Sequence, residues 1–188
     1  MKKLRVVSII CLVISSIVLI IGCGKDKSTK MSNEKIRSIQ TDKEKENSMQ
    51  IELYFDSSNG GGKKPLYKEE RILNKEEVMG EIIIQELIKG PGVKSDLKPV
   101  LPKETRLLSF SIKNNIAIIN FSKEVVTNME PAKEETSLKA IAGSLTQLPS
   151  VEKVKIQVEN KNVDTLGGNY DISEPFSKSE VTLKLKEK

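Results

Sequence analysis

From residue 50 onward, the chain contains several short stretches in which polar and apolar residues alternate. A period of two is typical of β-strands that bury one face. Two such stretches flank Asn114-Asn115, a pair that tolerates positive φ and suits a tight hairpin turn. The pattern predicts strands at 50–55, 66–73, 107–113, 116–122, 154–158 and, last, 181–185.

Two other stretches carry apolar residues at spacings of three and four, which is typical of amphipathic helices. The first begins after Asn74, an N-cap residue with Glu77 three positions later, and ends at Gly90 before a proline. The second covers 134–147 and ends before Pro149. The apolar positions of the first helix are Val78, Met79, Ile82, Ile83, Leu87 and Ile88; those of the second are Leu138, Ile141, Ala142, Leu145 and Leu148.

The order of these elements predicts the fold class. It is β-β-α-β-β-α-β, an α+β domain over 49–188 in which two helices pack on a mostly antiparallel sheet. Ala117 and Ile119 fall on one face of their strand, and Ile118 falls on the other. Since both faces are partly apolar, we expect the 107–122 hairpin to lie centrally in the sheet, with helices on at least one side.

The chain opens with a basic segment and an apolar run. Residues 1–5 are positively charged, and the 17 residues of 6–22 carry no charge, fewer than the roughly 20 of a membrane-spanning helix. The run ends in Ile-Ile-Gly22-Cys23, which resembles the lipobox of bacterial lipoproteins. The resemblance implies a signal peptide at 1–22, cleavage between Gly22 and Cys23, and a lipid on the Cys23 thiol that holds the body at the extracytoplasmic face of the cell membrane. An uncleaved anchor helix with an incidental cysteine is the alternative.

Residues 23–48 follow the predicted cleavage site. They are rich in Lys and Glu, contain few aliphatic residues and have no aromatic residue. So little apolar surface does not offset the entropy of ordering a chain. We therefore expect the lipidated cysteine to be followed by a disordered tether.

Composition excludes most catalytic and metal-binding classes. There is no histidine, and both cysteines lie within the first 23 residues, which excludes His-dependent hydrolases, His-ligated zinc and haem, and disulfide or iron–sulfur frameworks in the body. The formal charge of +5 falls to +2 without residues 1–22. With four arginines and 4% aromatic residues, the chain lacks the usual contacts of nucleic-acid readers. We predict no cofactor, no metal and no nucleic-acid partner.

Some acidic residues deserve scrutiny as catalytic candidates. On the first helix we expect a solvated face whose first-turn acids favour the helix dipole; these acids are Glu76, Glu77, Glu81 and Glu86. A carboxylate-only glycosidase needs two acids about 5–9.5 Å apart, and the loose candidates, which share no motif, are Glu69, Glu70, Asp164 and Asp171. The glycine run at 60–62 lacks the spacing of a phosphate-binding loop, so a hairpin loop is favoured.

Several short blocks occur in a characteristic order. They are 51–55, 86–91, 101–102, 118–122 and 145–154, with 171–176 as a closing segment. In these blocks the body resembles the GerM family of sporulation and spore germination domains. The resemblance implies a bacterial, extracytoplasmic, lipid-anchored domain without known catalytic activity, and a fold similar to the ring-building modules of envelope assemblies. It also implies a cell-envelope protein complex, including a ring-forming one, as the partner.

These observations favour a non-catalytic scaffold or interaction module, anchored to the membrane, in a sporulation or germination complex. The alternative is a module that binds peptidoglycan or another part of the cell wall. Wall binding would require exposed and clustered tyrosines among Tyr54, Tyr67 and Tyr170. Because Tyr54 lies within an alternating strand, we expect it to be partly buried.

Overall fold

The computed structural model describes residues 46–56, 66–92 and 96–186. The chain divides into two compact units, Met1–Glu46 and Asn47–Lys188, and the fold described below is that of the second. The predicted signal peptide at 1–22, most of the predicted tether and the glycine run at 60–62 lie outside the described residues. Their boundaries therefore stay predictions.

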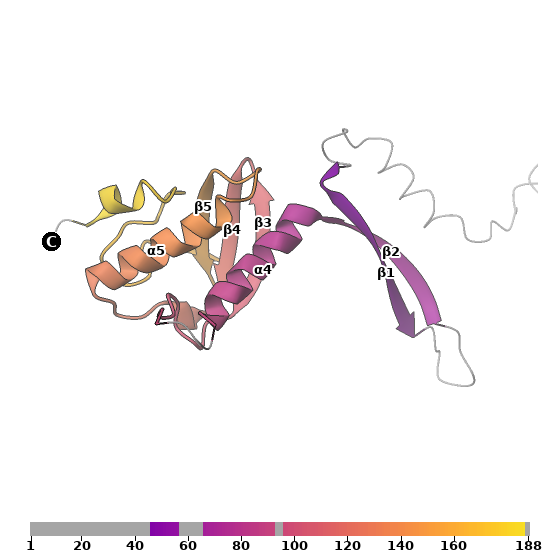
Figure 1. The fold of residues 1–188 in the computed structure, drawn as a ribbon, viewed down its shortest axis with the longest axis horizontal. Coiled ribbons are helices and arrows are strands. Elements are labelled where there is room, and N and C mark those ends of the chain that lie inside the picture. Colours follow the sequence, from indigo (N-terminus) through magenta and orange to yellow (C-terminus); the bar gives the residue numbers. More distant parts are fainter. Residues whose placement is uncertain (1–45, 57–65, 93–95, 187–188) are drawn as a thin grey trace, which may run out of the picture. The chain divides into compact units, whose positions relative to one another are not determined.

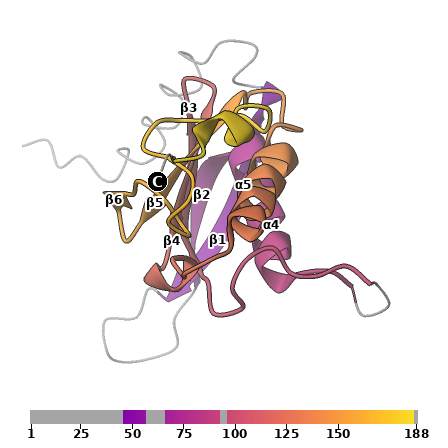
Figure 2. The ribbon, with the colours of Figure 1, turned by 90° about the vertical axis from the view of Figure 1, so that its left-hand side faces the viewer.

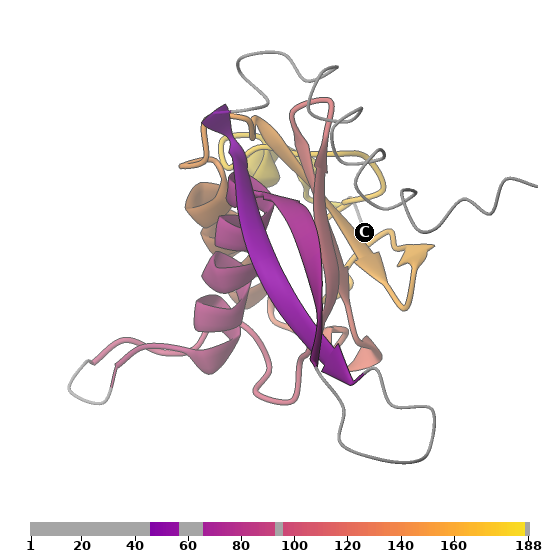
Figure 3. The same cartoon turned by 90° about the vertical axis from the view of Figure 1, so that its right-hand side faces the viewer.

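The first two strands form a long twisted ribbon (Figures 1 and 3). Strand β1 (Ser48–Asp56) pairs with β2 (Leu66–Asn74) in antiparallel register over their whole length, from Ser48 opposite Asn74 to Asp56 opposite Leu66. Both strands were predicted. The prediction of a single sheet was incomplete, because β1 and β2 make a two-stranded sheet of their own.

Helix α4 (Lys75–Lys89) follows β2 without an intervening residue. As predicted, Asn74 caps it: its side-chain oxygen accepts hydrogen bonds from the amides of Glu76, at 2.9 Å, and Glu77, at 3.1 Å. The helix ends at Gly90, which has a φ of 84°, a conformation that favours glycine. Local sequence signals therefore fix both ends of α4.

The main sheet has four strands in the order β3-β4-β5-β6. They are β3 (Leu107–Lys113), β4 (Ile116–Phe121), β5 (Lys153–Val158) and the short β6 (Lys161–Asn162). The predicted turn is confirmed, with φ of 50° at Asn114 and 62° at Asn115. Strand β4 lies inside the sheet and pairs in parallel with β5. The expectation that the whole hairpin is central was wrong, because β3 is an edge strand of this sheet.

The two helices lie side by side on one side of the main sheet (Figure 2). Helix α4 contacts β3, and α5 (Pro131–Leu145) contacts β5. Helix α5 begins three residues before its predicted start, because Pro131 fits the first turn, where its missing N–H costs nothing. Ala117, Ile119 and Phe121 of β4 are fully buried in the core, as the alternation suggested.

The chain ends in irregular structure instead of the predicted last strand at 181–185. Residues Val181–Lys184 form a 3-10 helix, η2, that contacts α5. Val181 is fully buried, but the described residues provide only an isolated bridge between Tyr170 and Leu185, not a ladder. Leu183 and Leu185 are exposed, so the alternation at 181–185 does not mark a buried strand face. Within the described part of the chain, no helix is long and apolar enough to cross a bilayer.

Candidate functional site

The predicted lipidation and cleavage residues, Cys23 and Gly22, lie outside the described residues. Among the described residues there is no group of three or more Cys, Asp or Glu side chains that could hold a metal ion.

Three of the four loose catalytic candidates, Glu69, Glu70 and Asp171, make side-chain contacts within the fold. On β2, Glu69 accepts a hydrogen bond from Arg71 at 2.7 Å, and Glu70 lies 3.7 Å from the Lys68 ammonium. Because they are consecutive strand residues, their side chains point to opposite faces. Asp164 and Asp171 belong to the segment after β6, where Asp171 accepts a hydrogen bond from the Ser173 amide at 2.9 Å.

The three tyrosines do not form a platform for a sugar. Tyr54 is 58% exposed, so the expectation of partial burial was wrong. Tyr67 is also exposed, but it lies opposite Phe55 in the register and therefore on the other face of the ribbon from Tyr54. Tyr170 is buried in the core.

The first-turn acids of α4 were predicted to lie on a solvated face, but both accept hydrogen bonds from other parts of the fold. The Glu76 carboxylate accepts hydrogen bonds from the amide of Ser150, at 2.9 Å, and from its hydroxyl, at 2.5 Å. The Glu77 carboxylate accepts a hydrogen bond from the Ile112 amide of β3, also at 2.9 Å. The solvated-face interpretation was therefore wrong for these two acids, which tie α4 to the segment between α5 and β5 and to strand β3.

A fully buried carboxylate, Glu134, organises the C-terminal segment. Near the start of α5, it accepts hydrogen bonds from the Thr165 hydroxyl and from the backbone amides of Leu166, Gly167 and Asn169, at 2.7 to 3.1 Å. The Asn169 side-chain amide donates another at 2.8 Å. Burial opposes ionisation, but the hydrogen bonds from Thr165, Gly167 and Asn169 outweigh it and lower the pKa of the Glu134 carboxyl. Sequence analysis missed this residue.

Gly167 is required by the same cluster. A Cβ atom at this position would lie 2.7 Å from the Met129 Cβ and 2.8 Å from a carboxylate oxygen of Glu134. The backbone can approach the carboxylate only because no side chain intervenes. The contact between Glu134 and Gly167 therefore has a structural role: it holds the C-terminal segment against α5.

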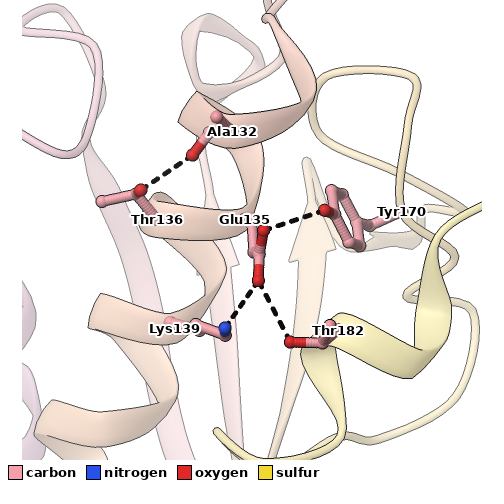
Figure 4. Close-up of polar contacts among 6 residues, drawn as sticks. All are labelled: Ala132, Glu135, Thr136, Lys139, Tyr170 and Thr182. Carbon is pink, nitrogen blue, oxygen red and sulfur yellow. Dashed lines mark hydrogen bonds and ion pairs between the residues drawn. The ribbon is translucent and has the colours of Figure 1, made fainter.

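The next residue, Glu135, forms a second polar cluster between α5 and η2 (Figure 4). One carboxylate oxygen accepts a hydrogen bond from the Tyr170 hydroxyl at 3.1 Å. The other accepts from Lys139, at 2.5 Å, and from Thr182, at 3.0 Å. The Lys139 ammonium, together with Thr182 and Tyr170, lowers the pKa of the Glu135 carboxyl. The pKa of Tyr170 is raised by burial and by its contact with Glu135.

This cluster borders a shallow polar hollow of about 560 Å³. Its lining includes Lys139, Ser177, Lys178 and Thr182. The Lys139 charge is already engaged by Glu135. The hollow therefore presents hydroxyl and ammonium groups together with the carboxylate of Glu152.

The ribbon presents an uncovered apolar face. Alternation and the β1–β2 register place on one side six apolar side chains, which we call the apolar ribbon face: Met49, Ile51, Leu53, Phe55, Tyr67 and Leu73. None of the described residues of the two strands is buried, and Phe55 is 43% exposed. The Arg71 guanidinium lies 5.6 Å from the centre of the Phe55 ring and shields it only in part.

A second apolar surface lies between the two helices. We call it the α4–α5 groove; its volume is about 840 Å³. Its floor and walls include Ile82, Ile83, Leu87 and Val100, and Ile82 is 47% exposed. Polar side chains such as Lys133 line it from the α5 side. The described part of the molecule thus combines structurally engaged acids with two exposed apolar surfaces.

Comparisons with known proteins agree with this architecture. A comparison with curated proteins finds no match. Among solved structures, a proposed lipoprotein from Clostridium perfringens is 40% identical and has a TM-score of 0.69; the match covers 79% of this chain and 100% of that one. The tandem GerMN domains of the Bacillus subtilis sporulation protein GerM are 22% identical, with a TM-score of 0.44 and coverage of 71% and 46%. The first GerMN domain alone is 25% identical, with a TM-score of 0.46 and coverage of 70% and 98%.

The comparison with protein families identifies the family of this chain. The Germane family, described as sporulation and spore germination, matches residues 52–164. This range runs from the ribbon through both helices to the segment after β6. Over more than half of its length, the chain belongs to the Germane family of sporulation and spore germination domains.

Proposed function

We propose that this chain is an extracytoplasmic lipoprotein, anchored to the cell membrane through Cys23, whose Germane domain is a non-catalytic interaction module in a cell-envelope complex of sporulation or germination. The lipobox-like Gly22-Cys23 supports the anchor, and so does the similarity to the proposed lipoprotein of Clostridium perfringens. The family membership supports the cellular context.

One observation carries the interaction role. The prominent acids of the described residues are engaged within the fold, as Glu76 with Ser150 and Glu134 with 165–169 illustrate. In contrast, the apolar ribbon face and the α4–α5 groove remain exposed. Large exposed apolar patches on a soluble domain mark contact surfaces.

The anchor is tested by metabolic labelling with a fatty-acid analogue in cells that express the full chain. Cys23→Ser should abolish the label and release the protein from membranes, since two acyl chains are needed for stable anchoring. The matched control is Cys11→Ser, which removes the chain's other cysteine and should leave the label unchanged. Equal labelling of Cys23→Ser and the unchanged protein would contradict the proposal.

The interaction role is tested by crosslinking in sporulating cells. The full chain should yield a small, reproducible set of envelope proteins, and Phe55→Asp should lose part of that set because it charges the apolar ribbon face. The control is Tyr54→Asp, on the opposite face of the same strand. An identical set from all three forms contradicts docking through this face. Sedimentation with insoluble peptidoglycan that is lost only in Tyr54→Asp would support wall binding instead.

A further inference from the structure

Strand β3 forms an outer edge of the main sheet. On the other side of the sheet, β5 pairs with the short β6 and forms an isolated bridge from Val154 to Phe176. Strand β3 pairs only with β4 among the described residues, and its Leu108 and Lys113 are exposed. An edge of this kind presents backbone groups to which another chain can add a strand. The outward backbone groups of β3 therefore determine whether the domain accepts such a strand.

The amide of Ile112 points away from the sheet at this edge. It donates a hydrogen bond to a carboxylate oxygen of Glu77 at 2.9 Å, and not to the neighbouring strand β4. In an antiparallel pair, the backbone groups of alternate residues point outward, so Phe110 shares the orientation of Ile112. An added strand would bind the backbone of these two residues, and Glu77 already occupies one of the groups that it would need.

Helix α4 positions the Glu77 carboxylate. Asn74 caps the helix through its side chain, and Glu77 is the third helical residue. A glutamate at this position ordinarily reaches back to the amide of the N-cap residue. Here Asn74 also ends the β1–β2 ladder opposite Ser48, and Glu77 reaches forward to β3 instead. The carboxylate is thus held at the sheet edge by a helix whose start is fixed by its own cap.

Two other features of β3 also oppose the addition of a strand. The register with β4 shifts between Leu107 and Ser109, as at a β-bulge. At the other end of the strand, Lys113 is exposed. Bulges and lysines are both devices by which natural proteins protect sheet edges. The regular part of this seven-residue strand lies between them, and it is there that Glu77 binds the Ile112 amide.

We propose that Glu77 guards the β3 edge: its carboxylate occupies the outward Ile112 amide and so prevents strand addition from a second copy. Every copy carries the same edge, so two β3 strands would pair antiparallel about a two-fold axis if this amide were free. The inference is independent of the proposed interaction role, because Glu77 belongs neither to the apolar ribbon face nor to the lining of the α4–α5 groove.

The test is site-specific photocrosslinking of the full chain in cells. The exposed Ser109 of β3 is replaced by p-benzoylphenylalanine in a copy with one epitope tag, and a second copy without the photoprobe carries another tag. With Glu77→Ala in both copies, doubly tagged adducts that map to 107–113 of the second copy should increase at least about five-fold, since the Ile112 amide is then free to bind another strand. The chain with Glu77 should give little of this adduct.

Two variants separate guarding from stability. Glu77→Gln keeps an acceptor oxygen for the Ile112 amide and should leave the adduct near the level of the unchanged chain. Glu76→Ala is the matched control, because it removes two hydrogen bonds to Ser150 from the same turn of α4 but frees no amide of the sheet edge. It should not increase the adduct. Circular dichroism verifies that each variant is folded.

A milder variant covers the case in which Glu77→Ala does not fold. Glu77→Asp keeps the charge that favours the first turn of a helix, but its side chain is one methylene shorter and withdraws the oxygen from Ile112, so the adduct should again increase.

The proposal is overturned if folded Glu77→Ala or Glu77→Asp gives no more adduct than the unchanged chain. It is equally overturned if Glu76→Ala or Glu77→Gln gives the same increase, or if the new adducts map outside 107–113. Loss of folding in both the Ala and the Asp variant would overturn it too, since the contact would then be one that the fold itself requires.

Discussion

The ring of Phe110 lies directly against Gly80, where β3 meets α4. A Cβ atom at Gly80 would lie 2.2 Å from the Phe110 Cζ and 2.3 Å from its Cε1. Glycine within a helix ordinarily costs about 0.5–1 kcal/mol relative to alanine. Here close packing accounts for the residue, since both Gly80 and Phe110 are buried.

Gly80→Ala should therefore destabilise the protein even though alanine favours helices. Overpacking of a core costs about 1–3 kcal/mol, and the gain in helix propensity is about 1 kcal/mol. We therefore expect a net loss of up to about 2 kcal/mol in the free energy of unfolding by urea. Gly92→Ala, at a site with no atom within 4 Å, is the control and should change little. A more stable Gly80→Ala protein would refute the packing explanation.

Glu134→Gln should be among the most damaging single-atom exchanges. The amide replaces an acceptor oxygen with a donor among groups that themselves donate, such as the Gly167 amide and the Thr165 hydroxyl. Because hydrogen bonds to charged groups contribute about 1.5–3 kcal/mol each, we expect a loss of roughly 2–4 kcal/mol in unfolding free energy. Hydrogen exchange of the Leu166, Gly167 and Asn169 amides should accelerate at the same time.

The control for this change is Glu130→Gln, four positions earlier. Glu130 is exposed, and its side chain makes no capping hydrogen bond to α5. Its replacement should shift the unfolding free energy by less than about 0.5 kcal/mol. Equal effects at Glu130 and Glu134 would mean that net charge, and not the buried cluster, determines stability.

The Glu180–Lys153 pair predicts acid sensitivity. The Lys153 ammonium, 2.7 Å away, and hydrogen bonds from Ser177 together lower the pKa of the Glu180 carboxyl from 4.5 to about 2. A depressed pKa means that the pair stabilises the fold fully above about pH 4.5 and loses this contribution as the pH falls toward 2. Glu180→Gln should therefore flatten the dependence of unfolding free energy on pH within that window. Glu81→Gln, an exposed change on α4, is the control, and an equal flattening there would contradict the assignment.

Stability should depend strongly on which residue occupies the turn between β3 and β4. Asn114 has a φ of 50°, a conformation that costs ordinary L-residues about 1–2 kcal/mol. Asn114→Val should lose stability by about this amount, since a branched Cβ is poorly tolerated there. Asn114→Gly should be neutral or stabilising, as glycine suits this type of turn. Equal thermal midpoints for the two variants would argue against the backbone explanation.

Much of the fold could be predicted because its signals are local. Asn74 and Gly90 delimit α4 through backbone geometry that acts within a few residues. The Asn114-Asn115 turn is equally local, and so is the alternation that buries Ala117 and Ile119. The second two-residue turn, at Glu159-Asn160 with φ of 51° and 63°, was missed, because glutamate rarely adopts positive φ.

The rest depended on contacts between distant segments. Glu134 and its hydrogen-bond donors are more than 30 positions apart, and nothing in the local pattern distinguishes it from the other acids. Strand 181–185 was wrongly predicted because its alternating apolar residues do not share a buried face: Val181 is buried, whereas Leu183 and Leu185 are exposed. The separation of the ribbon from the main sheet likewise depends on which strands pair, which periodicity does not encode.

Asn74 ends β2 and caps α4 at once, so the ribbon and the helix are mechanically continuous. No flexible linker separates β2 from α4, so a force on the ribbon acts directly on the first turn of the helix. That turn holds the Glu76–Ser150 and Glu77–Ile112 hydrogen bonds. A force on the ribbon therefore acts first on the contacts that join α4 to the segment after α5 and to the edge strand β3.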